Sequence, residues 1–451
     1  MKTTKRIFAA LLAAALSLSM TACRSAGKLD IPNVQDGSGD FQKNMHQAQG
    51  FGCWFTEICE TDDGFYFDYG KLYYLEKETH KATVVCGKPD CDHTTGDCNA
   101  LISSRSLWQY GDKLYYIAED FKVENDRRVE DHGRRVFSVN MDATGRKVVQ
   151  DLDFEVGGDT SFTVSPPIFH RGSVYFVYSG TLYRAALGAD LKDAEVIWAP
   201  EPKEQEFWNG IPVYTGNEPT YTLWGDGDLV YFMLNLEQPD GLYRDTLFSY
   251  DPNTKEVKQL WVTPSADVVG GPKRQDDEGV KVFTIGGTED EVDQWYVLNG
   301  YIYFFLSGNG LWRCDLDTGE YQKLADTTAQ AAYGTAIFSD EHMWLLNDGP
   351  AELSAIREGG DTVFVYGLDG TLQKELSLKA LTDEVTVHGY FVLFASGDEV
   401  YLMADAGIVT EGEDIVQGDF IVSGDKKETR NILVCLNAET GEITQIMEFD
   451  H

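Results

Sequence analysis

Basic residues are scarce in this sequence. Its 451 residues include 37 Lys and Arg against 74 Asp and Glu, so the formal net charge is −37. Nucleic acids are bound mainly through Lys and Arg contacts to phosphate, so this composition argues against a nucleic-acid partner. It also argues against a chain that lies flat on anionic lipid, because that attraction depends on basic side chains as well. We expect an acidic, well-solvated surface.

Long apolar runs are also missing, except at the start of the chain. Residues 7–20 are apolar, three basic residues precede them, and small residues follow at positions 21 and 22. This run is too short to span the hydrocarbon core of a bilayer as a helix. A charged start, an apolar centre and small residues before a cleavage point are typical of a secretory signal. Residues 1–22 are therefore expected to be a signal peptide, whose removal leaves 34 basic against 74 acidic residues, or −40.

The residue after the expected cleavage point is a cysteine, Cys23. The leader with Thr21-Ala22-Cys23 resembles the lipobox signal of bacterial lipoproteins. That resemblance covers the leader alone, and it implies that Cys23 is diacylated on its sulfur, with palmitate-like chains, and becomes the new N-terminus. Two or more acyl chains anchor a protein stably, where one chain is marginal. We therefore expect a lipoprotein anchored to the cell membrane and facing its extracellular side; the alternative is ordinary secretion with an unmodified Cys23.

The segment after Cys23 is polar and rich in glycine. Residues 23–40 show no apolar period, so they predict a flexible tether between the membrane and the folded part. The folded domain is expected to comprise residues 41–451.

Local catalytic signatures are absent from the sequence. Neither the G-x-S-x-G elbow nor the H-E-x-x-H helix occurs, and the D-x-D-x-D-G calcium loop is missing too. A glycosidase pair of carboxylates needs only proximity in space, so sequence leaves that chemistry open. Most histidines are scattered and are expected at turns or on the surface: His46, His80, His132, His170, His342, His388 and His451.

Aromatic residues, by contrast, are abundant and recur in a repeated phrase. Phe, Tyr and Trp make up 12% of the chain, which favours pleated surfaces. About every 60 residues, a short apolar strand is followed by Asp, Asn or Gly in a turn and then by another short strand, which is the pattern of a hairpin. The seven copies begin at Leu72, Val136, Leu182, Leu247, Leu311, Val363 and Leu433.

Each copy belongs to a larger unit of about four strands. Most copies are preceded by an aromatic strand opened by glycine, such as Gly172–Phe176 or Gly300–Phe304, and by one more short strand before that. Four-stranded units at this period predict a β-propeller, because one blade cannot cover both of its faces but its neighbours can. We expect an all-β chain with seven four-stranded blades, with six or eight as alternative numbers and a pair of β-sandwiches as the rival architecture.

The repeated units also resemble a known group of proteins. Residues 50–449 are similar to uncharacterised β-propeller lipoproteins of Gram-positive anaerobes. This resemblance implies the same scaffold, and a scaffold does not fix a function.

The densest chemical cluster is a set of three cysteines and one histidine within 13 residues: Cys86, Cys91, His93 and Cys98. Thiolate and imidazole are the ligands that zinc takes in closed tetrahedral sites. We expect a structural zinc clip through these four residues, although their spacing is not that of a standard finger. The alternatives are a disulfide between two of the three cysteines in an oxidising compartment, and free thiols with a redox or copper role. Similar loops occur in the same lipoprotein group.

The remaining cysteines have simpler expectations. Cys53 is a substitute ligand for the cluster, and Cys314 and Cys435 lie within expected strands, where they should be buried as small apolar side chains.

These observations favour binding over catalysis. We expect the propeller to bind an extracellular ligand (a glycan, a peptide or a protein), with an enzyme acting on extracellular carbohydrate or a structural envelope component as the alternatives. Three inserts, 200–220, 262–293 and 404–430, exceed hairpin length, and inserts on a rigid repeat often carry binding.

Overall fold

The structure is a computed structural model, and it describes most of the expected folded domain. The described residues are 58–94, 97–104, 106–124, 127–152, 167–178, 180–199, 206–208, 211–213, 221–239, 243–264, 292–306, 310–325, 336–346, 362–377, 386–410, 415–417, 420–422 and 426–449. The expected signal peptide, Cys23, the tether and Cys53 lie outside them.

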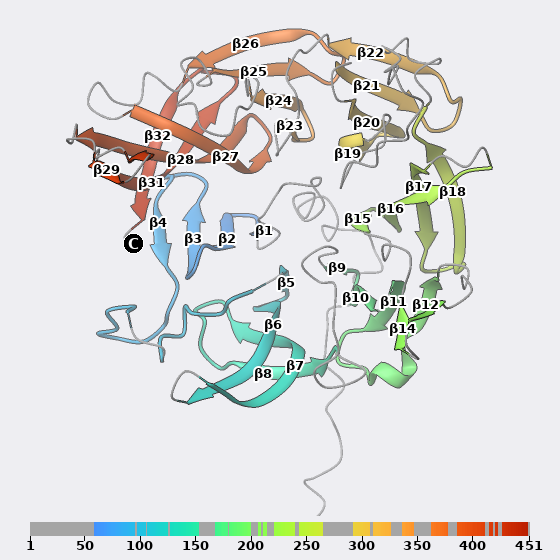
Figure 1. Ribbon diagram of the computed structural model, residues 1–451, viewed down its shortest axis with the longest axis horizontal. Coiled ribbons are helices and arrows are strands. Elements are labelled where there is room, and N and C mark those ends of the chain that lie inside the picture. Colours follow the sequence, from blue (N-terminus) through green and yellow to red (C-terminus); the bar gives the residue numbers. More distant parts are fainter. Residues whose placement is uncertain are drawn as a thin grey trace, which may run out of the picture.

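Seven four-stranded antiparallel sheets stand in a ring and form the blades of a β-propeller (Figure 1). This arrangement confirms the predicted fold and blade number, and it excludes the pair of sandwiches. Within each blade the strands pair in chain order, and we call them a to d from the centre of the ring outward.

The bounds of the first four blades follow the chain. Blade 1 contains β1 (Ile58–Glu60), β2 (Gly64–Asp68), β3 (Leu72–Glu76) and β4 (Ala82–Val84). Blade 2 contains β5 (Leu107–Tyr110), β6 (Lys113–Glu124), β7 (Arg127–Asn140) and β8 (Lys147–Asp151). Blade 3 contains β9 (Ile168–His170), β10 (Ser173–Tyr178), β11 (Thr181–Ala186) and β12 (Glu195–Trp198). Blade 4 contains β15 (Thr222–Asp226), β16 (Leu229–Glu237), β17 (Tyr243–Asp251) and β18 (Glu256–Val262).

The last three blades complete the ring. Blade 5 contains β19 (Val292–Leu298), β20 (Tyr301–Leu306), β21 (Gly310–Asp315) and β22 (Tyr321–Ala325). Blade 6 contains β23 (Ala336–Phe338), β24 (His342–Leu346), β25 (Thr362–Gly367) and β26 (Leu372–Ser377). Blade 7 contains β27 (Thr386–Ser396), β28 (Glu399–Thr410), β31 (Lys426–Asn437) and β32 (Ile443–Phe449).

Three short elements lie outside the blades. A small hairpin of β13 (Glu206–Trp208) and β14 (Ile211–Val213) interrupts the connection between blades 3 and 4. A second hairpin, β29 (Ile415–Gln417) and β30 (Phe420–Val422), lies between β28 and β31, and a 3₁₀ turn, η3, covers Leu191–Asp193. Among the described residues, no helix has the length and apolar character needed to cross a membrane.

Strand b carries an aromatic side chain at the same register position in all seven blades. Each of these side chains faces the strand c residue that lies two positions before the start of the c–d turn, as Tyr303 faces Arg313 and Tyr401 faces Cys435. The seven residues are Tyr66, Tyr115, Tyr175, Tyr231, Tyr303, Trp344 and Tyr401. Flat rings at a repeated position fill the space between neighbouring blades, which is why the sequence repeats them.

The repeated Asp or Asn in the sequence phrase caps the c–d turn. The carboxylate of Asp315 accepts hydrogen bonds from the backbone N–H groups of Asp317 and Thr318, at 2.9 and 2.8 Å. Asn437 accepts from Thr440 at 2.8 Å in the same way. A short polar side chain that bonds to the backbone two or three residues ahead stabilises such a turn.

Each seam between blades is a hydrophobic core shared by neighbours. At the seam that closes the ring, Phe65 of blade 1 packs against Phe394 and Tyr401 of blade 7, with ring centroids 4.5 and 5.2 Å apart. Within the described residues, blades 7 and 1 are each built from consecutive strands, so this seam is closed by side chains and not by a shared sheet.

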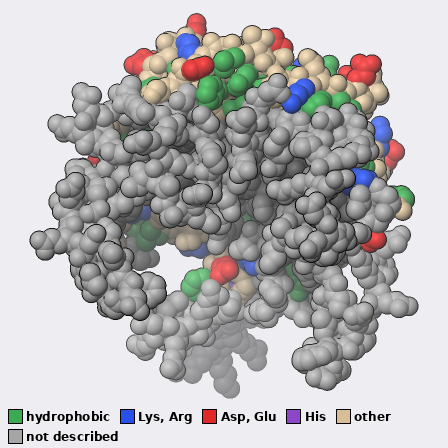
Figure 2. All heavy atoms as spheres, turned by 45° about the horizontal axis from the view of Figure 1, so that its top comes forward, with side chains coloured by type: hydrophobic (Ala, Val, Ile, Leu, Met, Phe, Trp, Pro, Cys, Tyr) green, Lys and Arg blue, Asp and Glu red, His purple; other side chains and the backbone are tan. Residues whose placement is uncertain are grey.

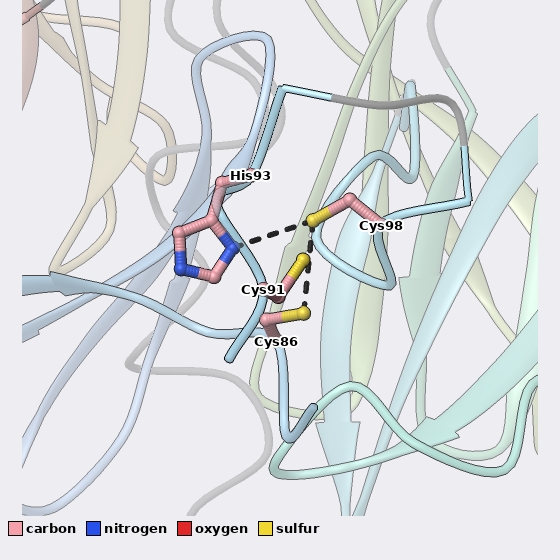
Figure 3. A group of neighbouring side chains, drawn as sticks. All are labelled: Cys86, Cys91, His93 and Cys98. Atoms are coloured by element: carbon pink, nitrogen blue, oxygen red, sulfur yellow. Dashed lines mark hydrogen bonds between the residues drawn. The ribbon is translucent and has the colours of Figure 1, made fainter. Parts of the chain in front are cut away.

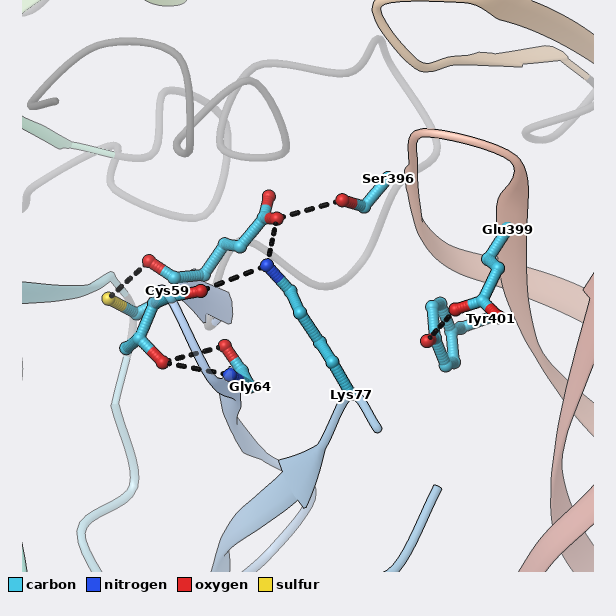
Figure 4. A network of polar contacts seen from close by, with 8 residues as sticks. Cys59, Gly64, Lys77, Ser396, Glu399 and Tyr401 are labelled. Carbon is cyan, nitrogen blue, oxygen red and sulfur yellow. Dashed lines mark hydrogen bonds and ion pairs between the residues drawn. The ribbon is translucent and has the colours of Figure 1, made fainter. Parts of the chain in front are cut away.

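Polar contacts reinforce the same closing seam. Glu60 of blade 1 accepts from Lys77 at 2.6 Å and from the Ser396 hydroxyl of blade 7 at 2.8 Å, as Figure 4 shows. Because the Glu60 side chain is only 9% exposed, its charge needs this pairing.

The two faces of the ring differ in their connections. Antiparallel pairing places the a–b and c–d turns on one face, the turn face, and the b–c and d–a connections on the other, the loop face. The turn-face connections are short, and the longest of them, residues 187–194 in blade 3, contains η3. All of the long ones leave strands on the loop face: 85–106, 152–167, 199–221, 263–291, 347–361 and 411–425. The expected inserts 200–220 and 262–293 lie mainly in such connections. The expected bounds of the third insert, 404–430, are too wide, because residues 404–410 and 426–430 prolong β28 and β31 and only 411–425 connect them. On the described edge at the top of Figure 2, acidic side chains are scattered among basic and apolar ones.

Candidate metal centre

The cysteine cluster lies in the connection that leads from β4 of blade 1 to β5 of blade 2. This is a d–a connection, and in Figure 1 it swings to the outer edge of the ring before it returns to the centre. The loop is tied to blade 1, because the Leu72 N–H donates to the Ala100 carbonyl at 2.8 Å and the Ser104 N–H donates to Asp68 at 2.6 Å.

The other side of the loop rests on blade 2. Gly87 has φ +64°, and a Cβ there would lie 2.6 Å from the carbonyl oxygen of Asp142 and 2.6 Å from the Thr144 methyl. Asp142 and Thr144 belong to the c–d turn of blade 2, so the loop packs directly on that turn. The amide of Asn99 then holds the two ends of the cluster together by donating to the Cys86 carbonyl at 2.9 Å.

The four predicted ligands converge on one point. Their ligand atoms all lie within 4.8 Å of one another, and Figure 3 shows the three sulfur atoms grouped beside the imidazole ring. Cys98 Sγ is 3.6 Å from Cys86 Sγ and 3.5 Å from His93 Nδ1. Cys86 and Cys98 are buried, whereas Cys91 and His93 are half-buried.

These separations suit a shared metal ion better than a disulfide. A disulfide needs sulfur atoms about 2.05 Å apart, and the three sulfur atoms of this loop belong to free cysteines. A tetrahedral zinc with bonds of about 2.3 Å to sulfur and about 2.0 Å to nitrogen places its ligand atoms about 3.5 to 3.8 Å apart. The observed 3.5 and 3.6 Å agree with that geometry.

The electrostatics of the cluster favour one thiolate. Burial acts to raise the pKa of Cys86, but hydrogen bonds from the backbone N–H groups of Lys88 and Asn99, and from the other two thiols, outweigh it and lower the pKa to about 6. For Cys98, burial and its hydrogen bonds with the thiols of Cys86 and Cys91 raise the pKa to about 11. The protons that these thiols share are the ones that a metal ion would displace.

The other cysteines behave as the sequence suggests. Cys314 and Cys435 are buried in strands β21 and β31, which confirms their expected place in the apolar interior. Cys59 is buried as well, at the start of blade 1.

Two further groups of ligand-type side chains were missed by the sequence reasoning. One consists of His80, Glu399 and Cys435, and the other of Glu341, His342 and Asp398. The members of each group come from different blades, so no local spacing in the sequence marks them.

Comparison with known proteins identifies no family for this chain. No family model matches the chain, and no curated protein matches its sequence. An oligogalacturonate lyase in complex with manganese is 12% identical, with a TM-score of 0.38, covering 64% of this chain and 73% of that one. A prolyl endopeptidase is 11% identical, with a TM-score of 0.43, covering 90% of this chain and 57% of that one.

Alanine at Gly87 should loosen the seat of the cluster. Any non-glycine residue in the left-handed region costs about 1–2 kcal/mol, and overlap with the blade 2 turn should add roughly 1–3 kcal/mol. Gly70→Ala is the matched control, because Gly70 has φ +71° with no atom within 4 Å of the new Cβ. Chemical denaturation should show the larger loss of unfolding free energy for Gly87→Ala; equal losses would contradict the packing described here.

Proposed function

We propose that this chain is a membrane-anchored extracytoplasmic lipoprotein whose propeller binds an extracellular ligand at the loop face, without catalysing a reaction. The observation that carries the proposal is the asymmetry of the ring: its long connections all begin and end on one face, whereas the other face has short turns. Binding residues usually lie on variable loops that a rigid scaffold positions.

The class of ligand follows from the surface and the compartment. The acidic composition disfavours nucleic acid, and the expected leader directs the chain out of the cytoplasm. A glycan, a peptide or a protein at the cell surface is then the ligand, with the membrane itself contacted through the lipid on Cys23.

The cysteine cluster is proposed to be a structural zinc clip within this scaffold. Cys86, Cys91, His93 and Cys98 would supply four protein ligands, which leaves zinc no open position for a substrate or a reactive water. The clip would hold the first long connection, residues 85–106, against blade 1 and the c–d turn of blade 2.

Loss of one ligand should remove this zinc. We expect Cys91→Ser to contain one equivalent of zinc fewer per chain than the parent protein, with a lower melting temperature, because structural zinc contributes its binding energy to folding. Cys314→Ser, which removes a buried thiol from blade 5, is the control and should keep the parent's zinc. Elemental analysis of the purified proteins makes the measurement. Equal zinc in the parent protein and in Cys91→Ser would rule the clip out. If the parent protein contains no metal and has two titratable thiols fewer than its cysteine content, a disulfide is indicated instead.

The lipid anchor has its own test at Cys23. In a bacterial host that processes lipoproteins, the full chain should incorporate labelled palmitate and fractionate with membranes, because the acyl chains carried by Cys23 would hold it there. Cys23→Ser should lose both properties and leave the folded domain intact. A Cys23→Ser protein that is still labelled and membrane-bound would contradict the lipobox assignment.

Ligand binding should depend on the loop face. The soluble domain beginning at Phe41 is screened against arrays of glycans and peptides and against surface proteins. We expect the unmutated domain to bind a ligand from one of these sets. Replacing residues 411–425 by a two-residue Asn-Gly turn joins Thr410 to Lys426, which already pair across β28 and β31, and should weaken binding at least tenfold. Asp317→Ala on the turn face should change nothing. Binding that is lost only on the turn face would refute the assignment, and release of cleaved glycan would establish an enzyme.

A further inference from the structure

At two seams of the ring, an arginine at the same position of strand c contacts the next blade. In blade 3, Arg184 donates to the carbonyl of Pro252 in the c–d turn of blade 4. In blade 5, Arg313 donates to the carbonyl of Leu368 in the corresponding region of blade 6, at 3.2 Å. Both arginines face the repeated aromatic of strand b. At the same position in blade 7 stands Cys435, opposite Tyr401.

At the seam between blades 7 and 1, the c–d turn of blade 1 carries a histidine, His80. His80 occupies the turn position that Gly319 and Gly441 fill in blades 5 and 7, and it shares their left-handed backbone, with φ +52°. In blade 4 the position is Lys255, with φ +62°, which reaches back to Glu195 of blade 3 at 3.1 Å. His80 likewise reaches back to the preceding blade.

The partner of His80 is a carboxylate of blade 7. His80 Nε2 lies 3.1 Å from Glu399 Oε1, and the other oxygen of Glu399 accepts the Tyr401 hydroxyl at 2.5 Å; Figure 4 shows this last contact. The Cys435 sulfur completes the group, since the ligand atoms of His80, Glu399 and Cys435 all lie within 4.8 Å of one another.

The seam between blades 7 and 1 differs from the seam between blades 3 and 4 in its charged groups. Between blades 3 and 4, the two cations Arg184 and Lys255 surround Glu195. Between blades 7 and 1, the equivalent positions hold a thiol and an imidazole beside Glu399. These groups offer sulfur, nitrogen and oxygen lone pairs at the positions where the other seam offers cations, so a divalent ion bound by them would supply positive charge beside Glu399.

We propose that His80, Glu399 and Cys435 bind a second metal ion, of the zinc class, that closes the ring between blades 7 and 1. Imidazole, carboxylate and thiolate together suit a borderline-soft divalent ion. Cys435 is buried, while the His80 and Glu399 side chains are 25% and 23% exposed, so the fourth position of the ion is left to water on the solvent side. The ion would join groups that are 319 residues apart in the sequence.

The test uses the full-length protein in a Cys91→Ser background, in which the loop cluster is disabled. Titration with Co²⁺ should then show one bound ion with the charge-transfer absorption of a single thiolate ligand. Adding His80→Ala or Glu399→Gln should weaken binding at least about tenfold, since loss of a ligand costs no less than loss of an outer-shell partner. Adding Cys435→Ser should remove the thiolate absorption.

Two controls distinguish the site from general effects. His342→Ala removes a histidine that lies 2.7 Å from Asp398 at the neighbouring seam, in a group without a thiol, and should leave the titration unchanged. Cys314→Ser removes a buried thiol of blade 5 and should also leave the titration unchanged. Circular dichroism establishes that each variant is folded. If folded Cys91→Ser protein binds no Co²⁺, or if His80→Ala binds it as tightly as its parent, the second site does not exist, whatever the fate of the loop cluster.

Discussion

The ring depends on one constraint, which is that no blade can bury both of its faces without its neighbours. The repeated aromatic position of strand b meets this constraint, because Tyr66, Tyr303, Tyr401 and their equivalents present a large ring to each seam. A buried aromatic removes about 150–250 Å² from water, and each Å² of apolar surface contributes about 25 cal/mol. Burial also raises the pKa of their phenols, for Tyr66 to about 12, so these side chains stay neutral within the seams. The blades are therefore stable as a set, because a closed ring leaves no blade face uncovered.

The same constraint explains why the two faces of the ring differ. On the turn face, the strands must reverse quickly to keep the rings in register, and Asp or Asn caps such as Asp315 and Asn437 fix these short turns. The loop-face connections carry no such requirement, since they only need to bring the chain back to the next strand. Long additions are tolerated there at little entropic cost, because the cost of closing a loop grows slowly with its length. Short capped turns on one face and long connections on the other are the physical basis of the ligand recognition that we propose.

Much of this fold could be predicted because its determinants are local. The hairpin phrase places strand, cap and turn within a few residues, so that Asp251 or Asp315 marks a turn without any knowledge of the partners of its strands. The cluster in the Cys86–Cys98 loop could be recognised in the sequence for the same reason, since its ligand-type residues are close together in the chain. The group around His80 was not, because its members meet only when blade 7 returns to blade 1. In the sequence, His80 is indistinguishable from an ordinary turn residue, and its left-handed backbone appears only in the structure.

Blade 1 differs from the other blades because it forms the seam at which the ring closes on blade 7. Every other pair of neighbouring blades is joined by the chain, but blades 7 and 1 meet only through side chains among the described residues, so this seam is where the ring can open. The proposed membrane tether would pull on the same blade, since it enters there. Both proposed metal groups flank blade 1, one at its seam with blade 2 and the other at its seam with blade 7. A metal ion would add a cross-link at each place, and the entropy that it would remove from the open state grows with the length of chain that it closes. The contact between His80 and Glu399 spans almost the whole ring, so a cross-link there constrains the open state most.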